Sequence, residues 1–247
     1  MNRDKLVFLD TETTGLGADG RLCQVAYKFL GVEKEALFKP PVPIEIEAMS
    51  VTHITNKMVA DKEPFIDSKM FNELEKIFAA GNILVAHNAD FDAGILKKEG
   101  LQAEKIIDTH KIAHYLDVDG EILRHSLQYL RYYFDLEVED AYAHDALGDV
   151  RVLEKLFDHF FEKMIIEEKT EEKVIEKMIK ISKLPILIKK FNFGKYSGER
   201  VSDVAKKDSG YLTWLFNQKV MDRENGINND ENWIFTLDKY LNQDRLF

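Results

Sequence analysis

Three observations predict an α/β protein with a mixed sheet flanked by helices and a small α+β module at the C-terminal end. The chain opens with the buried-type strand Leu6-Val7-Phe8-Leu9, and two further β-rich runs follow it before residue 40. Beyond Pro40, Pro41 and Pro43, short apolar runs alternate with helical patterns, as in sheets whose strands are joined by covering helices. Residues 191–247 break that alternation.

The elements are expected in the following order. The runs Leu22–Leu30 and Glu33–Phe38, separated by Gly31-Val32, predict a hairpin, and later strands are expected at Ile83–Ala86 and Lys105–Ile107. Helices are expected over Ile44–Met49, Ser68–Ala80, Ala89–Glu99 with Asn88 as N-cap, Thr109–Leu116, Ser126–Phe134, and from His144-Asp145 onward. Strand and helix therefore alternate after the opening meander, which favours a covered mixed sheet.

The charged segment Glu167 to Lys173 interrupts the apolar stripe of the long helix and predicts a domain boundary. We expect a large domain over residues 1–166, a linker helix over 167–190 and a small module over 191–247. Within the module, a hairpin is expected around Gly194 and Gly198, then a helix capped by Ser209 and a last helix opening at Asn228 to Asp230.

Composition narrows the class of protein. The net charge of -10 argues against a protein that coats nucleic acid, although residues 177–207 carry nine bases against two acids. No apolar stretch has the length of a membrane span, and no signal-type segment opens the chain. The single cysteine, Cys23, lies in an apolar run and has no internal partner for a disulfide. We therefore expect a cytoplasmic protein that does not associate with membranes.

Four acids stand at strand ends or helix starts. Asp10 and Glu12 project from the same face of the first strand, because side chains alternate along a strand. Asp92 falls in the first turn of the helix after the strand Ile83–Ala86. Asp149 lies one turn into the long helix, and His144 precedes it in the loop, since five residues on one helix would turn the two side chains apart.

Four carboxylates suit two hard cations such as Mg²⁺ or Mn²⁺, which prefer oxygen ligands. Two such ions about 4 Å apart can hold the attacking and leaving oxygens of a phosphoryl displacement. A histidine whose pKa lies near the working pH can take the proton from water. The pattern therefore suits a two-metal phosphoryl displacement, in which a histidine such as His144 could take the proton.

These motifs resemble those of the DEDDh exonucleases, the DnaQ-like superfamily of the polymerase III epsilon subunit. The matching segments are Asp10-Thr11-Glu12-Thr13-Thr14-Gly15, His87-Asn88-Ala89-x-Phe91-Asp92, and His144 with Asp149. The resemblance implies a ribonuclease H-like fold and 3′-5′ release of nucleoside monophosphates. It also implies two divalent metals on Asp10, Glu12, Asp92 and Asp149, with His144 as the base.

The same resemblance implies which residues approach the terminal nucleotide. They are Thr13, Gly15, Leu16, Asn88, Phe91 and His53, where Thr52-His53 stands at the place of a common His-Gly pair. His87, after a buried strand, is interpreted as a hydrogen-bonded structural histidine, and Asp108-Thr109 as a structural pair.

The C-terminal segment resembles the small module that follows the nuclease domain in exonuclease X-type proteins. Its signature is Phe193-Gly194-Lys195-Tyr196-x-Gly198 followed by Gly210-Tyr211-Leu212-x-Trp214. Lys195, Tyr196 and Arg200 could grip nucleic acid as basic and aromatic residues do in single-strand binders. Tyr211, Trp214 and Leu215 are expected in the core of the module.

The leading hypothesis is a 3′-5′ exodeoxyribonuclease that acts on single-stranded or frayed DNA 3′ ends in repair or proofreading, with a polymerase as a candidate partner. An RNA-trimming exonuclease of the ribonuclease T or oligoribonuclease type is an alternative, because contacts to the 2′-hydroxyl are not visible in the sequence. A catalytically silent, polymerase-associated subunit and a ribonuclease H-type endonuclease are further alternatives. Occupation of all five catalytic positions disfavours the silent subunit, and His144 disfavours the endonuclease.

Overall fold

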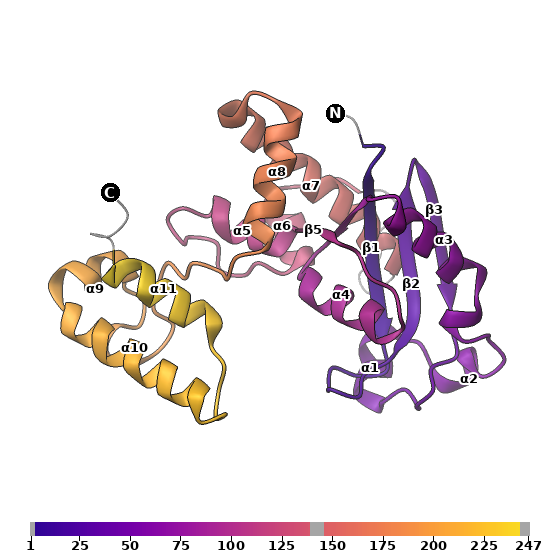
Figure 1. Ribbon diagram of the computed structural model, residues 1–247, viewed down its shortest axis with the longest axis horizontal. Helices are drawn as coiled ribbons and strands as arrows, with labels where there is room; N and C mark the ends of the chain where they lie inside the picture. The colour runs from indigo at the N-terminus through magenta and orange to yellow at the C-terminus, as the bar shows by residue number, and fades with distance from the viewer. Residues whose placement is uncertain (1–2, 139–145, 243–247) are drawn as a thin grey trace. The chain divides into compact units, whose positions relative to one another are not determined.

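The computed structural model describes residues 3–138 and 146–242, and it divides into two compact units (Figure 1). The first unit comprises residues 1–110 and 124–182, and the second comprises residues 111–123 and 183–247. Helix α8, Glu171–Ser182, lies within the expected linker of 167–190 and belongs to the first unit, where Ser182 Oγ accepts a hydrogen bond from the backbone N–H of Asp108 at 2.7 Å. The domain boundaries at residues 166 and 190 stay a prediction.

The first unit is built on a mixed five-stranded sheet of order β3-β2-β1-β4-β5. The strands are β1 Leu6–Thr13, β2 Leu22–Phe29, β3 Val32–Leu37, β4 Ile83–Ala86 and β5 Lys105–Asp108. The first three pair antiparallel, and β1, β4 and β5 pair parallel. This confirms the predicted mixed sheet that opens with a three-stranded meander.

The hairpin turn between β2 and β3 lies one residue earlier than predicted. Leu30 and Gly31 both have positive φ, 51° and 76°, as a two-residue turn matched to the strand twist requires. Val32 is already the first residue of β3, so its assignment to the turn was wrong.

Helices cover both faces of the sheet. Val7 and Leu9 of β1 belong to one core cluster with side chains of α3, Lys69–Ala79, and α4, Ala89–Lys98. Phe8, which points the opposite way, meets Phe157 of α7, Ala146–Glu168, edge to face with ring centroids 5.4 Å apart. Strand β1 is thus buried on both sides, with α3 and α4 on one face and α7 on the other.

The remaining elements of this unit are short. They are α1 Ile46–Thr52, α2 Asn56–Val59, the 3-10 turn η1 Phe65–Asp67, α5 Thr109–Leu116, which continues into the second unit, and α6 Leu127–Tyr133. Asn88 and Ser126 stand at the predicted N-cap positions of α4 and α6, but neither side chain caps its helix.

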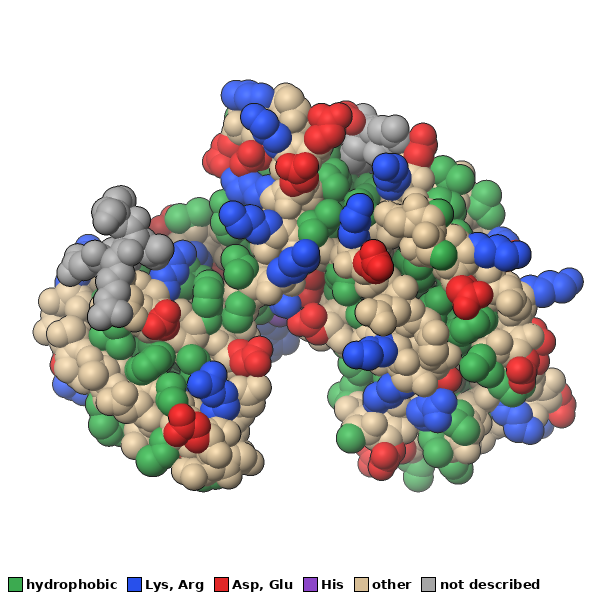
Figure 2. All heavy atoms as spheres, in the orientation of Figure 1, with side chains coloured by type: hydrophobic (Ala, Val, Ile, Leu, Met, Phe, Trp, Pro, Cys, Tyr) green, Lys and Arg blue, Asp and Glu red, His purple; other side chains and the backbone are tan. Residues whose placement is uncertain are grey.

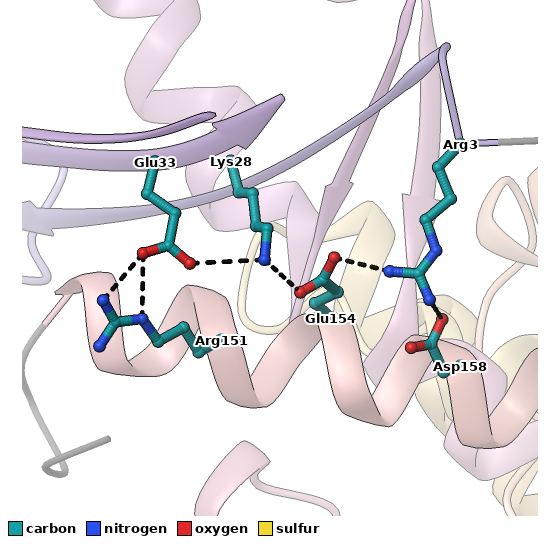
Figure 3. Close-up of polar contacts among 6 residues, drawn as sticks. All are labelled: Arg3, Lys28, Glu33, Arg151, Glu154 and Asp158. Atoms are coloured by element: carbon teal, nitrogen blue, oxygen red, sulfur yellow. Dashed lines mark hydrogen bonds and ion pairs between the residues drawn. The ribbon is translucent and has the colours of Figure 1, made fainter. Parts of the chain in front are cut away.

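A row of alternating charges joins α7 to the sheet (Figure 3). Its ion pairs are Arg151–Glu33 at 2.8 Å, Lys28–Glu33 at 3.4 Å, Lys28–Glu154 at 2.8 Å, Arg3–Glu154 at 2.6 Å, and Arg3–Asp158. Arg151, Glu154 and Asp158 lie on α7, whereas their partners lie on β2, β3 and the segment before β1. The row holds the stretch of α7 from Arg151 to Asp158 against the sheet, and this stretch begins two residues after Asp149.

The second unit is helical in the part that the structure describes. Besides most of α5, its described elements are the 3-10 turn η2 Gly194–Tyr196, α9 Val201–Lys207, α10 Ser209–Glu224 and α11 Glu231–Leu241. The hairpin expected around Gly194 and Gly198 is present only as a single antiparallel bridge, Lys190 to Arg200. The core gathers around Phe191, whose ring stacks on Trp233 at 4.9 Å.

Two expectations for this unit were wrong in detail. Asp208, and not Ser209, is the N-cap of α10, because its carboxylate accepts a hydrogen bond from Tyr211 N at 3.1 Å. Trp214 is 54% exposed, so it does not belong to the core in which it was expected, whereas Leu215 is 4% exposed. Across the described ranges, no helix combines the length and the apolar character needed to cross a bilayer.

Candidate active site

The sheet and α7 bring three of the predicted acids together. Asp10 and Glu12 lie on β1, and Asp149 lies in the first turn of α7. Each offers a carboxylate oxygen, and these oxygens all lie within 4.8 Å of one another. Since Asp10 and Glu12 share with Phe8 the face of β1 that α7 covers, the cluster forms where that face reaches the end of the strand.

Asp92 approaches from α4, on the other side of β1. Its side chain is buried, and its Oδ1 accepts hydrogen bonds from the Thr11 backbone N–H at 3.0 Å and from Thr11 Oγ1 at 2.8 Å. Asp92 does not belong to the group of three, yet its charge helps to raise the pKa of Asp10. The fourth acid is therefore a close electrostatic neighbour, held by the residue between Asp10 and Glu12.

Burial and mutual repulsion raise the pKa values of these acids. Burial, followed by the charges of Asp92, Glu12 and Asp149, raises the pKa of Asp10 well above its ordinary value. Burial, with Asp149 and Asp92, raises the pKa of Glu12 to about 7. Burial raises the pKa of Asp92 to about 7 against the opposing effect of its hydrogen bonds from Thr11. The site holds more negative charge than its surroundings neutralise.

Gln128 of α6 touches the cluster directly. Its side-chain Nε2 donates a hydrogen bond to Asp149 Oδ1. Its Oε1 is buried and accepts no hydrogen bond from the described residues. Sequence reasoning missed this glutamine, because no spacing along the chain links it to Asp149.

These features fit divalent cations. The three clustered side chains offer only carboxylate oxygens, the donors that Mg²⁺ and Mn²⁺ prefer. Bound cations would offset the repulsion that raises the pKa values of Asp10 and Glu12. A metal-bound water would also supply a donor for the buried Oε1 of Gln128. The acids are thus suited to hold metal.

His144, predicted as the general base, lies outside the described residues. Helix α7 is described from Ala146, with Asp149 in its first turn.

The end of β1 and the loop after it carry three of the residues predicted to approach the terminal nucleotide. Thr13 is buried and donates from Oγ1 to Gly15 O at 3.1 Å, and Leu16 is 89% exposed. At Gly15, a Cβ would lie 2.4 Å from Glu45 Oε2, so a side chain there would displace Glu45. The loop thus presents an exposed apolar tip four residues after Glu12 in the sequence.

The C-terminal end of α4 holds this loop in place. Lys98 Nζ donates to Ala18 O at 2.9 Å and to Gly20 O at 3.2 Å. Arg21 donates from Nε and Nη2 to both carboxylate oxygens of Glu99, at 2.8 and 2.9 Å. Helix α4 therefore positions both Asp92 and the loop, a role that the sequence reasoning missed.

The other predicted nucleotide contacts lie at chain reversals or against the core. His53 is exposed and ends α1 with φ of 58°, and Asn88 is exposed with φ of 65° before α4. Phe91 is partly buried and packs against the main core. Their roles toward a nucleotide stay predictions.

His87 has the structural role predicted for it. Its Nδ1 hydrogen-bonds Thr109 Oγ1 at 2.9 Å and its Nε2 hydrogen-bonds His125 O at 2.7 Å. Burial and the neighbouring histidine His110 lower its pKa to about 3. Asp108 is structural too, because its Oδ1 accepts the backbone N–H groups of Asn88 and His110.

Residues 7–157 match the family model described as Exonuclease, and residues 191–220 match the model described as Exodeoxyribonuclease X-like C-terminal. The chain belongs to the exonuclease family. It is 33% identical over 217 residues to Exodeoxyribonuclease 10 of Escherichia coli strain K12, covering 86% of this chain and 90% of that relative. It is 32% identical over 161 residues to the DNA polymerase III subunit epsilon of Treponema pallidum, covering 60% of this chain and 72% of that subunit.

A solved structure of exonuclease X in complex with 5′ overhanging duplex DNA superposes with a TM-score of 0.54 at 28% identity, covering 72% of this chain and 99% of that chain. The predicted resemblance, the ribonuclease H-like fold and the 3′-5′ exonuclease class of this family member are confirmed. Membership of the family implies a divalent metal, and the acids described above provide a place for it.

The crowding of acids predicts that Asp10→Asn makes the metal-free protein more stable at pH 8. Folding raises the pKa of the Asp10 carboxyl. The protein therefore loses stability as the pH rises through the folded pKa, because the unfolded chain has already released the proton at a lower pH. The neutral amide removes that loss. We expect the melting temperature in EDTA to rise by roughly 2–6 °C at pH 8. The gain should be much smaller near pH 4, where the folded carboxyl is protonated and the unfolded one is close to its ordinary pKa of 3.8.

Asp61→Asn is the control, since Asp61 is exposed and lies outside the cluster. An Asp10→Asn protein that melts below wild type at pH 8, or that gains equally at both pH values, would contradict the electrostatic account.

Proposed function

We propose that this protein is a metal-dependent 3′-5′ exodeoxyribonuclease that releases nucleoside 5′-monophosphates from DNA 3′ ends. The observation that carries the proposal is the meeting of Asp10, Glu12 and Asp149 at the end of β1 in a chain of the exonuclease family. DNA is the proposed substrate because the relatives that align over most of their length include Exodeoxyribonuclease 10.

In this proposal two Mg²⁺ or Mn²⁺ ions are held by Asp10, Glu12 and Asp149, with Asp92 as the fourth acid. Bound cations would stabilise the attacking and leaving oxygens of the phosphodiester. Thr11 fixes the carboxylate of Asp92 through Oδ1, and Gln128 fixes that of Asp149. The protein therefore holds its ligands in place before a metal arrives, which lowers the conformational cost of binding it.

His144 is the proposed general base, five residues before Asp149 in the sequence. Nearby carboxylates would stabilise the imidazolium that forms when the ring takes a proton from the attacking water.

The terminal nucleotide is proposed to lie against the loop after β1. The exposed Leu16 and the backbone near Gly15 would contact its base and sugar, with Thr13 fixing the loop from within. His53, Asn88 and Phe91 are the remaining proposed contacts. Single-stranded or frayed ends suit such a site, because an exposed apolar side chain can pack on an unpaired base.

Repair or proofreading is the proposed context, with a polymerase as a candidate partner, because the relatives include a polymerase III epsilon subunit. The cytoplasm remains the proposed compartment, since the single cysteine, Cys23, is a buried free thiol. RNA remains an alternative substrate.

Loss of the acids or of the base should abolish nucleotide release. Asp10→Ala and His144→Ala are expected to lower the rate in Mn²⁺ by at least about 10²-fold, the lower range for general acid–base catalysis. Asp61→Ala should retain the wild-type rate. Full activity in Asp10→Ala or His144→Ala would refute the mechanism.

The same assay identifies the substrate when 5′-labelled DNA and RNA strands of one sequence are digested side by side. Stepwise shortening of DNA at the higher rate is the expected result. Faster shortening of RNA would favour the exoribonuclease alternative, and internal cuts would contradict an exonuclease.

Gln128 is expected to act as a positioning residue for Asp149. Gln128→Ala removes the donor on Asp149 Oδ1 and should weaken Mn²⁺ binding roughly 10-fold, the scale of losing a partner that orients a metal ligand. Titration calorimetry of the protein with Mn²⁺ measures this without reference to activity. Gln128→Glu should weaken Mn²⁺ binding less than Gln128→Ala does, because it adds an acid beside the cluster. Equal Mn²⁺ affinity in wild type and Gln128→Ala would exclude the role.

A further inference from the structure

An exposed tryptophan begins a row of aromatic rings in the second unit. Trp214 of α10 is 54% exposed, whereas Trp233, the other tryptophan, is 4% exposed. The Trp214 ring lies on Tyr211 at a centroid distance of 5.5 Å, and Tyr211 meets Tyr196 edge to face at 5.0 Å. A single exposed apolar side chain needs no explanation, but a row of rings that ends in an exposed indole does.

Two lysines flank the inner end of this row. The ammonium groups of Lys195 and Lys207 each lie 4.7 Å from the centroid of the Tyr196 ring. Lys195 pairs with Asp208 at 3.2 Å, and Lys207 pairs with Glu199. Both lysine side chains are well exposed, at 65% and 47%. Exposed pairs of this kind are weak, so a phosphate can replace the carboxylate partner.

One carboxylate holds the two tyrosines of the row. Asp208 Oδ2 accepts a hydrogen bond from the Tyr196 hydroxyl, and its Oδ1 accepts the Tyr211 N–H at the start of α10. Gly194, with φ of 69°, lies so close to Tyr211 that a Cβ would be 3.0 Å from the Tyr211 hydroxyl. The two tyrosines behind Trp214 are thus held in place before any ligand binds, which lowers the cost of ordering this part of the face.

The net charge of this unit does not oppose the binding of a polyanion. The second unit has twelve acids and twelve bases, so its net charge is zero and the first unit carries the whole formal net charge of -10. On the face drawn in Figure 2, the acidic and basic side chains of the second unit are interspersed. A nucleic-acid strand therefore meets no net repulsion from this unit.

We propose that Trp214, Tyr211, Lys195 and Lys207 form a binding face for single-stranded nucleic acid, with a base stacked on the Trp214 indole and backbone phosphates at the two lysines. Aromatic rings combined with nearby cations are the means by which single strands are bound without sequence preference. Lysine is depleted in protein–protein interfaces, so its place beside the rings favours nucleic acid over a protein partner. The proposal rests on the proposed function for its choice of ligand.

Binding of a fluorescein-labelled oligothymidylate of 20 nucleotides, measured by anisotropy on the full chain in EDTA, tests the face without catalysis. We expect Trp214→Ala to weaken binding about 5- to 100-fold, the effect of losing one stacked base. Met221→Ala, on the same helix and 46% exposed, should bind as wild type does. Trp214→Tyr should recover most of the affinity, because it restores a ring.

Two further readouts distinguish stacking from a general loss of structure. Tryptophan emission of the wild type should be quenched by unlabelled oligothymidylate and that of Trp214→Ala should not. The double variant Lys195→Ala, Lys207→Ala should lower the slope of log affinity against log salt by about 1.4, the loss of two phosphate contacts on a single strand.

Equal affinity of wild type and Trp214→Ala, or an unquenched wild type, would overturn the proposal. A wild type that sediments as a dimer and a Trp214→Ala protein that sediments as a monomer would also overturn it, because the face would then be an interface between copies. Failure of the proposed function is seen separately, as absence of nucleotide release by wild type in Mn²⁺, and leaves this binding result interpretable.

Discussion

The repulsion between carboxylates on one buried strand is the constraint on which the rest of the site depends. Asp10 and Glu12 leave β1 on the same face because of strand alternation, and α7 adds Asp149 to that face. Without cations, burial and mutual charge hold the pKa values of Asp10 and Glu12 high. Such an arrangement costs stability and is sustained by the surrounding fold, as is common at functional sites.

The fold withstands this repulsion by fixing β1 from both sides. On one side, the charged row from Arg151 to Asp158 holds α7 to the strands (Figure 3). On the other side, α4 presents Asp92 to Thr11, the residue that points away from the clustered acids. Neighbouring residues of one strand thus face two different helices, and this geometry lets four acids approach one strand end although they come from three elements.

The sequence was informative wherever a local periodicity carried the signal. Alternation along β1 predicted the pairing of Asp10 with Glu12, and the helical pattern predicted that Asp149 lies near the start of α7. No periodicity in the sequence indicates which side chains of different elements contact one another. The hydrogen bond from Gln128 to Asp149 joins α6 to α7, and nothing in the spacing of the chain indicates it. Trp214 was misplaced for a similar reason, because helical periodicity gives the face of a residue but not what covers it.

The central claim is that these acids bind a pair of cations. Crystals soaked with Mn²⁺ and a nucleoside 5′-monophosphate test it most directly, since manganese is located by its anomalous scattering. The account predicts two peaks about 4 Å apart, with Asp10, Glu12 and Asp149 at coordinating distance and the phosphate of the nucleotide between them. Manganese peaks only at other acids, or none at the end of β1 at saturating Mn²⁺, would contradict it.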